Sequence, residues 1–420
     1  MKSRTVITLL CLPVLLAVTS NAQHPLPAQY TITDLGTLGG TNSFAYSINE
    51  NGMVSGGSNT TGQNDFVIQT AFLSNRGQLI NLGTLGGSAC PDCSSEGAAA
   101  SAYGTAALLS ETASADPNGE DFCEFNVNRP TRINHQCLAA IWRNGNLTAL
   151  PTLAGGNNAE VFFMNKKGEA VGVSETGVAD STCATPTLVR RFEAVKWSRD
   201  GKPAALPPLV GDTVSFAFTS NDSGQTVGFS GLCSNTILPP FVPGGPGAPH
   251  AVVWDDGGTP ALLGTPAGGA GNDVAVGIND RGQVTVNSYM LDGTIRAFVF
   301  TRGAPQALAT YSADAFLTVA PCCNNINNVG QIVGFTVDSS FTPRALIWQS
   351  KDQDPVDLNT LLPSDSPWFI QFPAGITNSG EIAATAMNID TFETHAVLLT
   401  PQHGLGPARG HIYPPIWHHK

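Results

Sequence analysis

The stretch Ile326-Asn327-Asn328-Val329-Gly330-Gln331-Ile332-Val333-Gly334 predicts the end of one strand, a tight turn and a second strand. Asn tolerates turn conformations and bonds its own backbone, while Gly supplies the positive φ that closes a hairpin. Apolar residues alternate after the turn, as in a half-buried strand. Variants of this turn motif recur at residues 48–52, 164–168, 220–224, 278–282 and 376–380. We therefore expect one hairpin to be repeated along the chain.

Two further motifs alternate with this turn. The second is a run that begins with Ala and ends in an aromatic or large apolar residue, at residues 71–73, 139–142, 194–197, 251–254, 297–300, 345–348 and 396–399. The third, Leu-Gly-Thr-Leu in its clearest form, follows at 81–87 and 149–153 and more loosely at Leu206, Leu263, Leu308 and 357–361. Each unit thus predicts four short strands: a before the Asn turn, b after it, c in the Ala run and d ending in the third motif.

The units number seven. The hairpin glycines recur every 48 to 58 positions, and the longer gap from Gly52 to Gly168 holds a weak unit at 97–111 that lacks the Asn turn. The chain opens on an isolated third motif at 33–40 and ends on a second motif at 396–399. An N-terminal strand d that completes the last unit would remove the two open edges. The pattern predicts an all-β, seven-bladed β-propeller of four-stranded blades, with a helical array of sheets or two sandwiches as alternatives.

The first 22 residues have the features of a secretory signal peptide. Lys2 and Arg4 precede an apolar run at 6–18, and Ser20-Asn21-Ala22 is a small-x-small cleavage site. Cleavage near Ala22 would leave a secreted or periplasmic chain with a propeller at 23–400 and a tail at 401–420. The net charge of -12 and the 12% of charged residues argue against nucleic acid as a partner. No mature segment is long and apolar enough to insert into a membrane.

Eight cysteines remain once Cys11, inside the apolar run, is set aside. An even number in an exported chain indicates disulfides. Cys123 and Cys137 lie within one b–c connection, which predicts that they pair with each other, and this staple is expected to be the main source of order in the insertion at 111–136. The partners of Cys90, Cys93, Cys183, Cys233, Cys322 and Cys323 stay open. Cys90-Pro91-Asp92-Cys93 could also be half a zinc site, but no second CxxC or paired His completes it, so no metal site is predicted.

The combination of Asp-Leu-Gly-Thr-Leu-Gly-Gly at 34–40, the repeated Ile-Asn-x-x-Gly turn and His-Ala-Val-Val-Trp at 250–254 resembles the HAF-repeat family, whose members are regarded as extracellular repeat proteins. The resemblance spans roughly residues 30–400. This sequence departs from the family pattern in the second unit, and it has the His that names the repeat only at His250 and His395. It implies export and repetition. It provides no catalytic residue and no cofactor.

The b–c connections are long and unlike one another, whereas the a–b and c–d turns are tight. Variable loops on a rigid ring are where binding usually resides, so we expect a ligand at the long-loop face. The candidate binding residues stand at the loop end of strand c: His250, His395, Glu193, Arg296 and Arg344. A hydrogen-bonded position within each blade is the plainer interpretation of the two histidines.

Two functions follow from this pattern. A non-catalytic protein that binds a glycan or an extracellular protein is favoured, because no catalytic motif is present. An exported polysaccharide hydrolase or lyase is the alternative, by analogy of fold alone. Carboxylates converging at the long-loop face would favour the enzyme, and exposed aromatic side chains there would favour binding.

Overall fold

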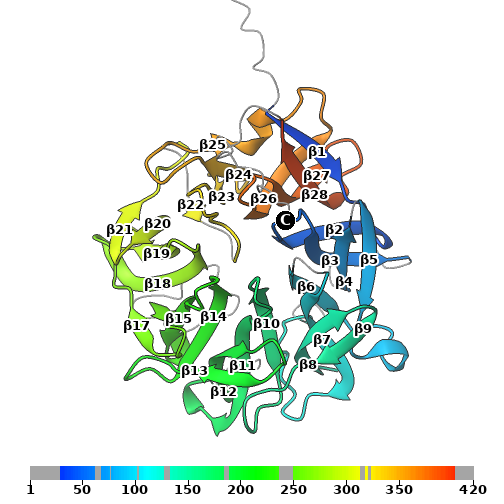
Figure 1. Cartoon of the computed structure of the whole chain (residues 1–420), viewed down its shortest axis with the longest axis vertical. Coiled ribbons are helices and arrows are strands. Elements are labelled where there is room, and N and C mark those ends of the chain that lie inside the picture. The colour runs from blue at the N-terminus through cyan, green and yellow to red at the C-terminus, as the bar shows by residue number, and fades with distance from the viewer. Residues whose placement is uncertain are drawn as a thin grey trace, which may run out of the picture.

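The computed structural model describes residues 29–61, 68–75, 77–101, 104–126, 133–183, 189–235, 249–312, 317–319 and 323–402. The signal-peptide and C-terminal-tail predictions lie almost wholly outside these residues. Seven four-stranded antiparallel blades surround a central axis, which confirms the predicted β-propeller (Figure 1). Helix in the described part is limited to four short 3-10 turns: η1 (Gly87–Ala89), η2 (Ser181–Cys183), η3 (Cys233–Asn235) and η4 (Leu358–Leu361). None of these could cross a bilayer.

The blades follow the chain in order, and each runs from the axis outward. Blade 1 consists of β2 (Gly39–Ile48), β3 (Val54–Thr60), β4 (Thr70–Asn75) and β5 (Gln78–Gly83). Blade 2 consists of β6 (Ser95–Ala100), β7 (Ala106–Ala115), β8 (His135–Arg143) and β9 (Asn146–Ala149). Blade 3 consists of β10 (Ala159–Met164), β11 (Ala170–Ala179), β12 (Arg190–Trp197) and β13 (Pro203–Leu206). Blades 4 and 5 are β14 (Val214–Ser220), β15 (Thr226–Gly231), β16 (His250–Trp254), β17 (Pro260–Leu262); and β18 (Gly269–Ile278), β19 (Gln283–Met290), β20 (Ile295–Thr301), β21 (Ala304–Ala307).

Blade 6 is β22 (Leu317–Val319), β23 (Ile332–Val337), β24 (Pro343–Trp348) and β25 (Val356–Asp357). Blade 7 takes three strands from the end of the chain, β26 (Trp368–Ile376), β27 (Ile382–Asn388) and β28 (Thr394–Pro401), and its outermost strand, β1 (Tyr30–Asp34), from the beginning. Tyr30 lies opposite Pro401 and Asp34 opposite Val397 in an antiparallel register. The predicted closure by an N-terminal strand is therefore confirmed.

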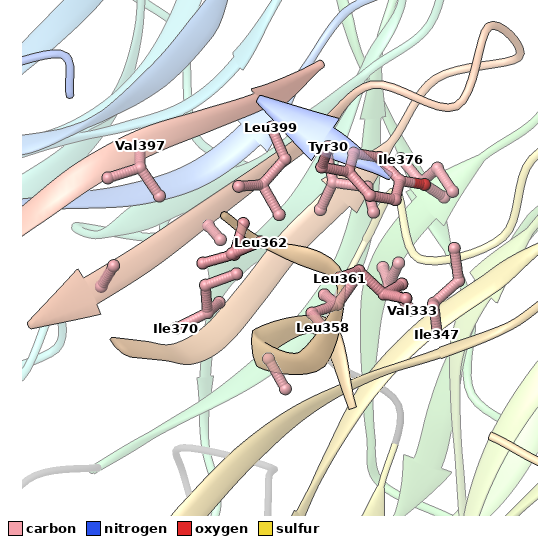
Figure 2. Packing of buried hydrophobic residues seen from close by; sticks show 14 residues of the cluster. Tyr30, Val333, Ile347, Leu358, Leu361, Leu362, Ile370, Ile376, Val397 and Leu399 are labelled. Atoms are coloured by element: carbon pink, nitrogen blue, oxygen red, sulfur yellow. The ribbon is translucent and has the colours of Figure 1, made fainter. Parts of the chain in front are cut away.

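An apolar cluster secures the closing strand. Tyr30 is buried against Ile376 and Leu399 of blade 7, and the cluster continues to Val333 and Ile347 of blade 6 (Figure 2). Similar clusters occupy the other interfaces between blades, because each sheet has an apolar face that it cannot bury alone. Closure thus depends on side-chain packing as well as on the strand pairing.

The Asn of the turn motif has two structural roles. Its Oδ1 accepts backbone N–H groups of its own turn, as Asn327 does from Val329 and Gln331 at 3.0 and 2.9 Å. Its Nδ2 donates to the corresponding carbonyl of the next blade, as Asn279 does to Asn327 O at 2.9 Å and Asn327 does to Thr377 O at 2.8 Å. The same bond links Asn49 to Ser101, Asn165 to Asn221 and Asn221 to Asn279. A belt of amides therefore ties neighbouring blades together around the axis.

The weak second unit forms a regular blade because Ser101 replaces the missing Asn. The Ser101 hydroxyl accepts from Thr105 N at 3.2 Å, and Gly104 takes the positive φ of 73° that the turn requires. Ser-x-x-Gly is therefore a variant of the same turn. It caps the hairpin but has no amide with which to continue the belt to blade 3.

Candidate functional site

The two ends of the ring differ in their connections. The a–b and c–d turns lie at one end, which we call the short-turn end, and the b–c and d–a connections lie at the other, the long-loop end. Parts of four b–c connections, residues 62–67, 127–132, 184–188 and 236–248, fall outside the described residues. The rest of the long-loop end carries the five candidate residues, most of the described cysteines and a set of exposed aromatic side chains.

The five candidate residues lie on five different blades and do not converge. Three of them pair with a carboxylate of their own blade. His250 Nδ1 lies 3.1 Å from Asp212 Oδ2, and Arg344 Nη1 lies 3.4 Å from Asp357 Oδ2. His395 Nδ1 lies 2.9 Å from Asp34 Oδ1. These contacts favour the structural interpretation of this position.

The other two candidates are also accounted for locally. Arg296 Nη2 lies 3.7 Å from Asp292 Oδ2 in the adjoining turn, at the surface. Glu193 on β12 is half-buried, and this burial raises the pKa of its carboxyl against the opposing effect of Arg191. No catalytic group is assembled from the five positions.

Two phenylalanines at this end have an unusual backbone conformation. Phe341, in the β23–β24 turn, is 76% exposed with φ of 60°, and Phe392, in the β27–β28 turn, is 73% exposed with φ of 63°. In the matching turn of blade 5 the position is Gly293, with φ of 83°. The backbone N–H at all three positions donates to the residue that begins the turn, at 2.8 to 3.0 Å. Positive φ costs a bulky residue about 1 kcal/mol or more.

Further aromatic side chains lie on the same two blades. Phe372, 40% exposed on β26, meets Phe335 of β23 edge to face at 5.2 Å. Trp368, the first residue of β26, lies 5.2 Å from the His395 ring. We call Phe335, Phe341, Trp368, Phe372 and Phe392 the aromatic surface of blades 6 and 7. Groups of exposed aromatic side chains often mark binding sites on protein surfaces.

The b–c insertion of blade 2 is docked on blade 3. Asn158 Nδ2 donates to Asp116 Oδ2 at 2.8 Å, and Gln136 Nε2 donates to Asn157 O at 2.7 Å. Phe122 is only 1% exposed and packs in an aromatic cluster with Phe192 and Phe216. The structure joins Cys123 to Cys137. Order in this segment has at least two sources, since Phe122 contributes a buried anchor beside the disulfide.

Two buried glutamates meet where this insertion touches blade 3. Oε2 of Glu175 accepts from Asn157 N and Asn158 N at 3.0 Å, whereas its Oε1 has no donor among the described residues. Glu120 accepts from Asn118 Nδ2 at 2.9 Å and from the backbone of Val189. Burial, and then the charge of Glu120, raise the pKa of Glu175 to about 8. At this pKa Glu175 carries a proton near neutral pH, the state in which it is not repelled by a neighbouring carboxylate.

A second group of acids faces the axis near the long-loop end. Glu96 on β6 and Glu160 on β10 hold equivalent places on neighbouring innermost strands. Burial raises the pKa of Glu96 to about 7, although a hydrogen bond from Tyr46 opposes the rise. Burial and the charges of Glu124, Glu96 and Asp121 raise the pKa of Glu160 well above its ordinary value. Protonated carboxyls near neutral pH are suited to donate a proton.

The short-turn end has two cavities that sequence reasoning did not anticipate. One, of about 100 Å³, lies at the mouth of the axis, where Lys166 Nζ is 3.1 Å from Asp222 Oδ2 and 3.7 Å from Asp280 Oδ2. The other, of about 290 Å³, lies between blades 2 and 3 and is lined by Arg143, Lys166, Lys167 and Arg199.

This second cavity has an apolar floor beneath its cationic rim. The floor includes Leu150 and Met164. No ion pair within the described part of the chain engages Arg143, Lys167 or Arg199, so the groove is suited to an anionic group. The sequence did contain a signal, because a chain with only 20 Lys and Arg places Arg143 and Arg199 in the c–d turns of adjacent units and Lys166 and Lys167 together in one a–b turn.

Two more disulfides lie at the long-loop end. Cys90 is bonded to Cys93, three positions away, and Cys183 of blade 3 is bonded to Cys233 of blade 4. The second bond links b–c connections of neighbouring blades. Cys323 is also disulfide-bonded, and Cys322 lies outside the described residues.

No protein-family model matches this sequence, and a comparison with curated proteins finds no match either. Several solved structures are similar to this chain at low sequence identity. The β-propeller domain of the Trilobed protease from Pyrococcus furiosus is 10% identical with a TM-score of 0.43, over 76% of this chain and 84% of that one. Streptogramin B lyase is 10% identical with a TM-score of 0.44, over 89% and 98%. A puromycin-hydrolyzing peptidase of Mycobacterium tuberculosis is 13% identical with a TM-score of 0.47, and this chain spans 56% of its length.

Proposed function

We propose that this propeller is an exported, non-catalytic binding protein that takes a glycan on the aromatic surface of blades 6 and 7. The observation that carries the proposal is the pair of exposed phenylalanines, Phe341 and Phe392, held at positive φ in corresponding turns. Each phenylalanine has two unfavourable features: a backbone at positive φ and an apolar ring exposed to water. Strain of this kind concentrates at binding sites, where a bound partner compensates for it.

A sugar ring suits such a surface. Its C–H faces pack against an aromatic ring and remove apolar area from water, while its hydroxyl groups remain solvated at the edges. Phe341 and Phe392 stand in the b–c turns of adjacent blades, at the same end of the ring. The acidic net charge of the chain disfavours an anionic membrane as the alternative partner.

Export is supported by two features. Residues 1–22 have the pattern of a signal peptide, and the described chain holds Cys90–Cys93, Cys123–Cys137 and Cys183–Cys233 disulfides. Disulfides of this number are typical of oxidising compartments. Localisation of the full chain in cell fractions tests this part directly, and a chain retained uncleaved in the cytoplasm would overturn it.

The glycan part is tested with the mature chain, residues 23–420, on a glycan array, followed by titration calorimetry of the oligosaccharide that binds. Phe341→Gly and Phe392→Gly each remove the ring and place the residue that blade 5 already uses there. We expect each to weaken binding by at least about fivefold, the effect of losing one aromatic contact. Folding should be unharmed, and the melting temperature unchanged or raised.

Val210→Ala is the matched control, since Val210 is a fully exposed apolar residue at the same end of the ring on another blade. It should bind like the parent. Equal affinity of the two Gly variants and the parent would refute the aromatic surface. Binding of an extracellular protein, with no glycan on the array retained, would refute the choice of ligand.

An exported polysaccharide hydrolase or lyase is the second candidate, and the specific observation in its favour is the Glu96 and Glu160 pair beside the axis. A protonated Glu96 could act as a general acid if a second carboxylate stands across a bound sugar. Release of reducing ends or unsaturated products from polysaccharides by the parent, and its loss in Glu96→Gln and Glu160→Gln, would establish this function in place of simple binding.

A further inference from the structure

We propose that Cys90, Cys93 and His135 form a thiol-dependent metal site that takes Zn²⁺ when the Cys90–Cys93 disulfide is reduced. The two cysteines lie in the d–a connection between blades 1 and 2, directly after η1. His135 is the first residue of β8, strand c of blade 2. The sequence shows only half a site here, and the tertiary structure brings the third ligand to it.

The ligand atoms are already close to the spacing that zinc requires. Cys90 Sγ lies 3.7 Å from His135 Nε2, and the three ligand atoms all lie within 4.8 Å of one another. A tetrahedral site with Zn–S of about 2.3 Å and Zn–N of about 2.0 Å has S–N edges of about 3.5 Å. The Cα atoms of Cys90 and Cys93 are 5.3 Å apart, so side-chain rotation can separate the freed sulfurs without moving the backbone.

The surroundings supply space and a further donor. Gly86 makes room for the pair, since a Cβ atom there would lie 2.7 Å from Cys93 Sγ. Asp92 Oδ1 lies 3.5 Å from Cys90 Sγ and is placed to become a fourth ligand. Thiolate, imidazole and carboxylate together are a donor set that zinc accepts.

His135 itself gives an independent indication. Its Nδ1 atom is buried and has no hydrogen-bond partner in the described structure, while its Nε2 faces Cys90. A buried polar atom without a partner calls for an explanation, and an ion that binds nearby is one of the recognised ones. Within the described residues the imidazole is therefore not held in place by a hydrogen bond at Nδ1, and its other nitrogen already faces Cys90 Sγ.

The chemistry balances with a dithiol reductant. The Cys90–Cys93 bond accepts two electrons and two protons and becomes two thiols, while the reductant closes to its own disulfide. Zn²⁺ then displaces the two thiol protons and is held by two thiolates and the neutral imidazole. The disulfide joins two residues of the connection to each other, whereas the metal would also join the connection to β8 of blade 2 through His135.

The test uses the mature chain, reduced with dithiothreitol and freed of it without air. Co²⁺ is added as a spectroscopic probe and Zn²⁺ as its competitor. We expect the reduced parent to bind one equivalent more of Zn²⁺ than Cys90→Ser/Cys93→Ser, with a thiolate-to-cobalt absorption that the double variant lacks. His135→Ala should weaken that binding by at least about tenfold, whereas Asp92→Ala should weaken it less.

Cys123→Ser/Cys137→Ser is the matched control, because it removes a disulfide from the neighbouring insertion and leaves the proposed ligands intact. It should bind metal like the parent. Circular dichroism establishes that each variant is folded, and His135→Gln, which keeps the size and polarity of the side chain, replaces His135→Ala if that variant is not. Equal stoichiometry of the reduced parent and the double Ser variant, or equal affinity after loss of His135, would overturn the site.

Discussion

Replacing Glu175 by Gln should leave the free energy of unfolding equal to that of the parent in acidic solution. In alkaline solution the variant should be more stable than the parent. Folding raises the pKa of Glu175 to about 8 from an ordinary value of 4.5, so the folded chain holds this proton more tightly than the unfolded chain. The free energy of unfolding therefore falls as the pH rises from 4.5 through 8. The interval corresponds to at most about 5 kcal/mol, an upper limit because water and side chains rearrange around a buried carboxylate when it ionises.

Gln imitates the protonated acid. Its carbonyl oxygen can accept the three donors that now reach Oε2, from Asn157 N, Asn158 N and Asn158 Nδ2, and its amino group faces Glu120. We therefore expect Glu175→Gln to match the parent near pH 4.5 and to exceed it by on the order of 2 kcal/mol at pH 8.

Urea unfolding at several pH values between 4.5 and 8.5, followed by circular dichroism, measures this difference. Asp365→Asn, at an exposed carboxylate, is the control and should run parallel to the parent at every pH. A Glu175→Gln curve that also runs parallel to the parent, with no crossing or divergence above pH 6, would show that Glu175 does not hold a proton in the folded state.

Three further outcomes are expected. Deleting residues 23–36 removes β1 and Tyr30 from blade 7, and should lower the free energy of unfolding by at least about 3 kcal/mol or cause aggregation; a melting temperature like that of the parent would contradict closure by this strand. Gly330→Val forces a β-branched residue into φ of 98° and should cost at least about 1 kcal/mol, which thermal unfolding would detect, while an unchanged melting temperature would argue against the left-handed turn. Asn327→Asp keeps the oxygen that caps the turn but replaces the amide that donates to Thr377 O and Gln331 Oε1 with a second acceptor. Urea unfolding should therefore show a loss of about 1–3 kcal/mol in the free energy of unfolding. The control Asn51→Asp, on the exposed side of an equivalent turn, should show almost no loss.

The candidate site was only partly predictable. The long-loop end was identified correctly as the place where cysteines and variable connections gather, because loop lengths can be counted in a repeat. Four of the five residues chosen at strand c proved to lie beside a nearby carboxylate, as His395 does beside Asp34, and Glu193 is half-buried on β12. The importance of Phe341 and Phe392 could not be seen in the sequence, because it lies in a positive φ and in exposure, and neither follows from residue type.

The sequence by itself determined the all-β class, the four strands of each unit, the number of blades and the closure by the first strand. These follow from local rules: period-two apolar alternation, turn residues that adopt positive φ, and an unpaired strand at each end of the chain. Tertiary structure alone decided which distant groups meet. The amide of Asn327 reaches Thr377, His135 reaches Cys90, and Glu120 reaches Glu175, because the ring brings together residues that are 45 to 55 positions apart. Such contacts depend on the orientation of each blade around the axis, and no periodicity within a single unit encodes it.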